Sequence, residues 1–144
     1  MLKGTRRMTR PQNGFGRGSG GDRYPPISKD EADAGARAIV RLLALWELTD
    51  AEAQALMGGL GSERWQRWKQ GRAGVIEREC ALRLSLLLGV HVGLKTLFSD
   101  PAGVRAWIRT PRRDLGGEAP LSVMMARSIT GLEQVRYLLA ALGQ

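Results

Sequence analysis

Apolar side chains recur along most of this chain with the period of an α-helix. From Ser28 onward, Ile39, Val40, Leu43 and Trp46 follow one another at three- and four-residue spacing, which predicts one apolar stripe on a helix of about five turns. Shorter stripes of the same period are formed by Ala53, Leu56 and Met57, and by Leu132, Val135, Leu138, Leu139 and Leu142. An alternating strand pattern of useful length does not occur. The sequence therefore predicts an all-α fold.

Capping signals predict where these helices begin. A Ser or Thr followed three residues later by Glu forms a capping box, in which side chain and backbone satisfy each other's exposed groups. The three boxes are Ser28 with Glu31, Thr49 with Glu52, and Thr130 with Glu133. Asp100 before Pro101 predicts a further helix start, with Val104, Trp107 and Ile108 on its apolar face. Gly116–Gly117 predicts a turn, and Pro120 another short helix.

The segment from Thr49 to Gln70 has the form of a helix-turn-helix. A short capped helix is stopped by Gly58 and Gly59, and a second short helix begins at Ser62. In such motifs the second helix lies in the major groove of DNA and the first crosses above it. Trp65 and Trp68 share one face of the second helix, where we expect them to pack inward; a base-stacking platform is the alternative.

The opposite face of that second helix carries side chains suited to reading DNA. Arg and Gln contact guanine and adenine edges in pairs of hydrogen bonds, and Glu accepts from cytosine. Basic side chains at the flanks would contact phosphates and set the register. The candidate DNA-binding residues are Ser62, Glu63, Arg64, Gln66, Arg67, Lys69, Gln70 and Arg72. The competing interpretation is an ordinary solvated helix face.

The stretch from Val75 to Phe98 is apolar nearly all round and predicts a helix that is covered on both faces. One face would pack on the helix-turn-helix, and the other on a second subunit or on the C-terminal part. The candidate dimerisation residues are Leu84, Leu87, Leu88 and Val92. Gly89 and Gly93 would kink the helix or let another helix approach closely. His91 and Cys80 are interpreted as packing residues rather than catalytic groups.

Composition narrows the class of protein further. One Cys and one His among 144 residues exclude a disulfide framework and a zinc cluster. No nucleophile–base constellation is visible, so we expect neither an enzyme, nor a cofactor, nor a small-molecule substrate. The nearly charge-free run from Leu84 to Leu94 is too short to cross a membrane, and the first 25 residues lack the apolar part of a signal peptide. These features predict a soluble, cytoplasmic protein.

The net charge of +8 is concentrated at the start of the chain. Residues 1–30 hold seven Lys or Arg against two Asp, which accounts for +5 of the total. This segment is rich in glycine and poor in apolar residues, so we expect residues 1–27 to form a disordered basic arm. Such an arm could follow nucleic-acid phosphates, giving affinity that depends on salt rather than on sequence. The alternative is a solvated leader without function.

Several runs of the sequence together resemble a known family. They are Arg67-Trp-Lys-Gln-Gly71, Leu94-Lys-Thr-Leu-Phe98, Trp107-Ile-Arg-Thr-Pro111, Leu115-Gly-Gly-Glu-Ala-Pro-Leu121 and Gly131-Leu-Glu-Gln-Val-Arg-Tyr-Leu-Leu139. Over roughly residues 40–142, these marks are similar to an Xre-like helix-turn-helix followed by the Xre/MbcA/ParS-like toxin-binding domain. That pair of domains occurs in antitoxins of RES-Xre toxin–antitoxin systems.

The resemblance implies an antitoxin that covers the active site of a RES-domain toxin, which consumes NAD, and that represses its own operon by binding operator DNA as a homodimer. The candidate toxin-binding residues are Trp107, Arg109, Pro111, Leu115, Gly117, Pro120, Val135, Arg136, Tyr137 and Gln144. The expected organisation is an arm at 1–27, a helix-turn-helix with dimerisation helices at 28–98, and a toxin-binding domain at 99–144. The alternative function is a stand-alone regulator whose C-terminal module only dimerises or binds another protein.

Overall fold

The computed structural model describes residues 28–126 and 128–144, and their regular structure is helical apart from one isolated bridge between Arg112 and Glu118. The predicted all-α fold is therefore confirmed for this part of the chain, while the predicted basic arm at 1–27 lies outside the described residues. The helices are α1 (Lys29–Leu45), α2 (Asp50–Leu56), α3 (Ser62–Lys69), α4 (Arg78–Leu97), α5 (Pro101–Arg109), the 3-10 helix η3 (Arg113–Leu115), α6 (Pro120–Met124) and α7 (Thr130–Leu142).

The first two capping boxes form as predicted. The Ser28 hydroxyl accepts a hydrogen bond from the Glu31 N–H at 3.1 Å, and the Glu31 carboxylate accepts one from the Ser28 N–H at 3.0 Å. Thr49 and Glu52 make the same reciprocal pair at 3.1 and 2.9 Å. Each pair satisfies two N–H groups that the helix itself cannot bond, so α1 and α2 begin where the sequence places them.

The third predicted capping box is wrong. Thr130 is already the first residue of α7, and the residue before it, Ile129, has helical backbone angles instead of the extended conformation of a cap. The Ser128 hydroxyl accepts from the Thr130 N–H at 3.0 Å in its place. The turn is also close-packed, because a Cβ on Gly131 would lie 2.1 Å from the carbonyl oxygen of Val123. Packing of α7 on the end of α6 thus decides how α7 begins.

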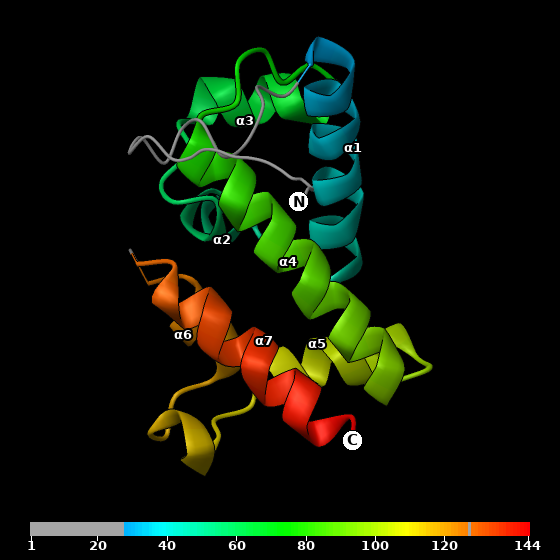
Figure 1. The fold of residues 1–144 in the computed structure, drawn as a ribbon, viewed down its shortest axis with the longest axis vertical. Helices are drawn as coiled ribbons and strands as arrows, with labels where there is room; N and C mark the ends of the chain where they lie inside the picture. The colour runs from blue at the N-terminus through cyan, green and yellow to red at the C-terminus, as the bar shows by residue number, and fades with distance from the viewer. Residues whose placement is uncertain (1–27, 127) are drawn as a thin grey trace, which may run out of the picture.

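Helix α4 runs through the middle of the molecule, with α1–α3 around one end and α5–α7 around the other (Figure 1). The predicted helix over 75–98 is shorter at its start, since Val75 is 82% exposed in the loop before α4. The predicted close approach at the two α4 glycines is confirmed. A Cβ on Gly89 would meet the Arg136 side chain at 2.6 Å, and one on Gly93 would meet Leu139 at 3.0 Å, so these glycines let α7 lie against α4.

The apolar character of α4 has a structural explanation. Taken whole, α4 is long and apolar enough to cross a membrane by length and composition, although its charge-free part alone is too short. In the folded chain, Leu87, Val90 and Leu94 are fully buried between the helices that surround α4. Its composition therefore matches the central helix of a core.

One continuous hydrophobic cluster links all the α-helices of the described residues. It contains Ile39 of α1, Trp68 of α3, Leu87 of α4, Ile108 of α5 and Leu139 of α7, each at most 2% exposed. The predicted boundary between residues 98 and 99 lies in the short connection between α4 and α5, where Ser99 is exposed, and the hydrophobic cluster continues from one side of it to the other. The two predicted domains are thus packed together, with α4 contributing to both.

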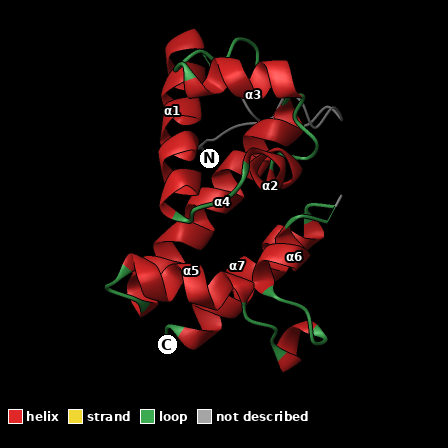
Figure 2. Cartoon of the chain, turned by 180° about the vertical axis from the view of Figure 1, so that it is seen from behind, coloured by secondary structure: helices red, strands yellow, loops and turns green. Residues whose placement is uncertain are grey.

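The C-terminal connections follow the sequence signals. The Asp100 carboxylate accepts a hydrogen bond from the Ala102 N–H at 3.0 Å and caps α5, whose first residue is Pro101. Gly116 and Gly117 have φ angles of 69° and 88°, a left-handed conformation that a residue with a Cβ adopts at a cost. Viewed from behind, α5 lies at the end of the molecule far from α3, and the 111–118 segment extends below α6 (Figure 2).

Candidate functional site

The segment from α2 to α3 forms the predicted helix-turn-helix. Trp65 and Trp68 are 3% and 1% exposed, with their ring centroids 6.4 Å apart, so the inward packing of both rings is confirmed and a base-stacking role is excluded. The turn between the helices is held by the Gln54 side-chain amide, which donates to the Leu60 carbonyl at 2.8 Å. Gly58 and Gly59 turn the chain with φ angles of 82° and 88°.

The opposite face of α3 is free of the core, as predicted. Glu63, Gln66, Arg67 and Gln70 are all exposed. The polar side chains therefore project together from one face of a helix whose other face is fixed by two buried indoles. Ser62 is exposed at the start of α3, where its hydroxyl lies 3.4 Å from the Gln54 amide.

The flanking basic side chains have partners within the chain. The Arg64 guanidinium pairs with Glu77 at 3.1 Å and donates to the Val75 carbonyl at 3.0 Å. Lys69 pairs with Asp50 at 3.2 Å. Asp50 also accepts from the Trp65 indole N–H at 2.8 Å, and these two hydrogen bonds, that of Trp65 first, lower the pKa of the Asp50 carboxyl. A contact between Lys69 and a DNA phosphate would therefore compete with the ion pair between Lys69 and Asp50.

Arg72 is exposed and donates to the side chain of Gln70, the exposed residue that follows α3. A further exposed arginine of this region comes from α1 and was not anticipated from the sequence. Arg37 donates to the Gly71 carbonyl at 3.4 Å, and Asp33 accepts from the Ala73 N–H at 2.8 Å. Both bonds fix the loop after α3 to α1.

A buried arginine of α4 contacts the end of the first helix of the helix-turn-helix. Arg83 of α4 is 1% exposed; its guanidinium donates to the Leu56 carbonyl at the end of α2 at 3.3 Å and lies 3.5 Å from Glu79. A cation at the C-terminal end of α2 is stabilised by the negative end of the dipole of that helix. No sequence signal separates Arg83 from the other arginines of the chain, because its burial depends on α2 lying across α4.

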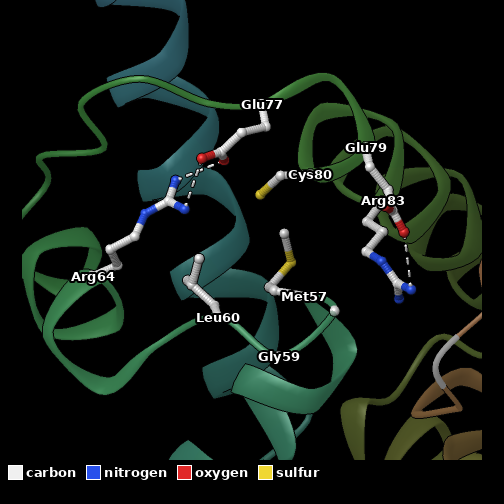
Figure 3. A pocket seen from close by; sticks show the side chains of 9 residues that line it. Met57, Gly59, Leu60, Arg64, Glu77, Glu79, Cys80 and Arg83 are labelled. Atoms are coloured by element: carbon white, nitrogen blue, oxygen red, sulfur yellow. Dashed lines mark hydrogen bonds and ion pairs between the residues drawn. The ribbon is translucent and has the colours of Figure 1, made fainter.

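A small cavity lies beside this arginine. It measures about 180 Å³ and is flanked by the Arg64–Glu77 and Arg83–Glu79 pairs (Figure 3). Cys80 lines it, and burial raises the pKa of this thiol to about 11. The thiol is therefore protonated near neutral pH, which agrees with the sequence-based interpretation of Cys80 as a packing residue. Within residues 28–126 and 128–144, no group of His, Cys, Asp and Glu side chains could hold a metal ion.

The predicted toxin-binding residues of α5 and the following loop lie at the surface or at its edge. Trp107 is half-buried, and the Arg112 guanidinium lies over its ring, 5.3 Å from the centroid. Leu115 is half-buried, whereas Pro111 and Gly117 are exposed. Arg112 also makes two hydrogen bonds of 2.9 Å to Asp114, and these lower the pKa of that carboxyl. Arg112 thus joins the ring of Trp107 to Asp114 within this loop.

Arg109, the remaining predicted residue of α5, faces the helix-turn-helix. Its guanidinium makes two hydrogen bonds to the Glu52 carboxylate of α2, at 2.9 and 3.1 Å. These bonds are the main cause of the lowered pKa of Glu52. The predicted toxin-binding residue is therefore already engaged by the other half of the chain.

Two predicted toxin-binding residues are core residues instead. Pro120 is buried at the start of α6, and Val135 of α7 is 0% exposed. Neither presents a side chain to a partner, because both lie where the terminal helices pack together. Arg136, Tyr137 and Gln144 remain on the surface, with Tyr137 79% exposed and the Arg136 side chain lying across Gly89 of α4.

The predicted dimerisation residues also divide into buried residues and exposed residues. Leu84 and Leu87 are 7% and 0% exposed inside a single protomer, so they are not available to a second copy. Leu88 and Val92 are 39% and 65% exposed and lie on the outer side of α4. Sequence periodicity could not separate these pairs, since α4 is apolar on every face.

Comparison with known families and proteins assigns the two halves of the chain. Residues 25–89 match the antitoxin Xre-like helix-turn-helix domain, and residues 94–143 match the antitoxin Xre/MbcA/ParS C-terminal toxin-binding domain. A protein of Sinorhizobium fredii (strain NBRC 101917 / NGR234), "Uncharacterized protein y4oB", is 27% identical over 134 residues, which cover 93% of this chain and 97% of that protein. The two adjacent domain matches, together with the fold that carries them, place this chain in the Xre/MbcA/ParS family of antitoxins.

Proposed function

We propose that the exposed face of α3 reads operator DNA and that the protein represses its own operon in this way. The observation that supports this is the sidedness of α3: Trp65 and Trp68 are buried, while Gln66 and Arg67 project from the opposite face. An Arg and a Gln on the outer face of a helix-turn-helix can each make paired hydrogen bonds to a base edge.

Arg67 is the residue on which the DNA-binding proposal depends most. It is exposed on α3, whereas Arg64 and Lys69 are held by Glu77 and Asp50. Arg67→Ala should therefore weaken binding to DNA from the region upstream of the gene by about 1–3 kcal/mol. Arg113→Ala is the matched control, because it removes an exposed arginine from η3, outside the helix-turn-helix. Equal affinity of the two variants in a titration would remove Arg67 from the base-reading residues.

We also propose that the partner of the antitoxin is a RES-domain toxin, which consumes NAD, and that residues of the C-terminal domain cover the toxin's active site. The resemblance of the sequence motifs to RES-Xre antitoxins supports this identity. The exposed ring of Tyr137, next to Arg136, is suited to such an interface, since Tyr and Arg contribute much of the binding energy of protein interfaces.

Point substitutions test this proposal better than a truncation does. Removing residues 100–144 would expose the α4 side chains that α7 covers, because Leu132, Val135 and Leu139 belong to the shared core. Tyr137→Ala should weaken co-purification with the product of the neighbouring toxin gene and restore its NAD consumption. Val75→Ala is the control, since Val75 is equally exposed but lies in the loop before α4. If no complex forms with the intact chain, the alternative of a stand-alone regulator is favoured.

A homodimer would place two helix-turn-helix motifs on one operator. Its interface would be formed by the exposed side chains of Leu88 and Val92. We propose this dimer, and we propose that the protein acts in the cytoplasm. Val92→Glu should then lower the apparent mass in sedimentation without unfolding the protomer, and an unchanged mass would locate the interface elsewhere.

A further inference from the structure

Helix α5 contacts the corner between α1 and α2 through two arginines one helical turn apart. Arg105 donates to the Leu45 carbonyl at 3.2 Å, and its Nε lies 3.5 Å from the Glu47 carboxylate. Arg109 makes its paired hydrogen bonds to Glu52. Two residues of the toxin-binding domain therefore bind the segment that leads from the end of α1 into α2.

The corner that these arginines hold is conformationally strained. Among the described residues, Glu47 is the one non-glycine residue with a positive φ, at 57°. A side chain disfavours this left-handed conformation, so it persists where surrounding contacts fix it. Arg105 contacts both the Glu47 carboxylate and the carbonyl two residues earlier, and thereby stabilises this conformation.

Glu52 takes part in two structures at once. Its Oε1 accepts a hydrogen bond from the Thr49 N–H at 2.9 Å, which completes the capping box of α2, and another from Arg109 at 2.9 Å. The Glu52 side chain is 22% exposed and the Arg109 side chain 45%, so this ion pair lies at the edge of the surface and is partly screened by water. The start of α2 and the position of α5 therefore depend on one carboxylate.

From α2 the contacts continue to the DNA-facing helix. Asp50, at the first position of α2, bonds to Trp65 and Lys69 of α3, and Gln54 holds the turn between the two helices. Helix α5 itself lies at the opposite end of the molecule from α3 (Figures 1 and 2). A contact at α5 can therefore reach α3 through α2, and also through α1, which packs against α3.

We infer that Arg105 and Arg109, with Glu47 and Glu52, form a latch that couples toxin binding to the position of the helix-turn-helix. The inference rests on the proposed function for the two ends that it connects. An acidic group of the toxin that pairs with Arg109 competes with Glu52, so toxin binding weakens the hold of α5 on α2. Binding of one partner then alters affinity for the other, and the effect is reciprocal.

The latch is tested first on the full-length antitoxin alone, by hydrogen exchange. Glu52→Gln keeps an oxygen that accepts from Thr49 in the capping box but removes the charge that holds Arg109. Amides of α2 should exchange about two- to fivefold faster in this variant than in the wild type. Glu118→Gln is the matched control, because it removes the same charge from an exposed residue outside the latch.

A second variant approaches the same pair from the other side. Arg109→Met should accelerate exchange in α2 as Glu52→Gln does, and the double variant should add little further, since both remove one interaction. Arg113→Met controls for the loss of an exposed arginine. The latch would be overturned if the amides of α2 exchanged at the same rate in Glu52→Gln as in Glu118→Gln.

The coupling is then measured with the toxin partner and the upstream DNA. In the wild type, the affinity for DNA should differ between the free antitoxin and its toxin complex. The ratio of these two affinities should move towards one in Glu52→Gln. An unchanged ratio would overturn the transmission through α2. If the wild type binds neither partner, the proposed function fails and the coupling with it, whereas the exchange experiment still decides whether α5 holds α2.

Discussion

The indole N–H of Trp46 donates a hydrogen bond to Nδ1 of His91 at 3.3 Å and joins the end of α1 to the middle of α4. Trp46 is 1% exposed, and His91 is half-buried beside it. The bond requires a neutral imidazole, because a protonated ring has no acceptor at Nδ1. Burial, and secondarily the charge of Lys95, lower the pKa of His91.

Acidification from pH 7 to pH 5 should therefore lower the free energy of unfolding. The folded chain binds a proton at His91 less readily than the unfolded chain, so stability is lost as the pH falls below the ordinary histidine pKa of about 6.5. The pKa values of Asp33, Asp50 and Glu52 are lowered, and these carboxylates stay ionised over this interval. Urea unfolding at several pH values measures the slope.

His91→Gln is the control for this pH dependence. A glutamine side chain offers an acceptor to Trp46 but does not titrate, and the sequence contains no other histidine. The variant should unfold with a stability that is nearly independent of pH between 5 and 7. A slope as steep as that of the wild type would assign the effect to another group.

Leu139→Ala should destabilise the whole chain rather than its C-terminal half. Leu139 is 2% exposed and packs on Gly93 of α4 inside the shared core, so its truncation should cost about 2–5 kcal/mol. Calorimetry and far-ultraviolet circular dichroism should report one transition at the same lowered temperature. Leu142→Ala on the same helix, where the side chain is 41% exposed, should change stability by less than about 1 kcal/mol. Two separate transitions would contradict a common core.

Gly58→Ala and Gly59→Ala should differ, although both residues have positive φ angles. The left-handed backbone costs each variant about 1–2 kcal/mol. A Cβ on Gly58 would also lie 2.7 Å from Nε of the buried Arg83, whereas one on Gly59 meets nothing within 4 Å. Gly58→Ala should therefore be less stable by a further 1 kcal/mol, roughly. Equal stabilities in urea would mean that Arg83 moves aside freely.

Gly131→Ala and Gly35→Ala should have opposite effects on stability. Gly35 lies inside α1 with its nearest neighbour, Leu84, 3.7 Å from the added Cβ, so alanine should stabilise α1 by about 0.5–1 kcal/mol. At Gly131 the added carbon would overlap the Val123 carbonyl, and α6 and α7 must separate to accept it. The melting temperatures should move in opposite directions; a stabilised Gly131→Ala variant would contradict the close packing of these helices.

The sequence predicted the helices well where local chemistry defines their ends. Ser28 and Thr49 form their capping boxes, and Asp100 with Pro101 starts α5, because a cap depends on residues that are three positions apart or fewer. The prediction failed at Thr130, where a contact with Val123 of another helix determines the backbone. The division of α3 into an indole face and a polar face was also predicted, since a helix with known ends has a known periodicity.

Local pattern determined the helical elements, the sidedness of α3 and the family motifs of this protein, because each depends on residues within a few turns of one another. Tertiary structure alone decided that Arg83 is buried beneath α2, that Leu84 and Leu87 belong to the core while Leu88 and Val92 do not, and that Arg109 pairs with Glu52. These outcomes depend on which helices meet across α4, and residues far apart in the chain acquire their partners only through that packing.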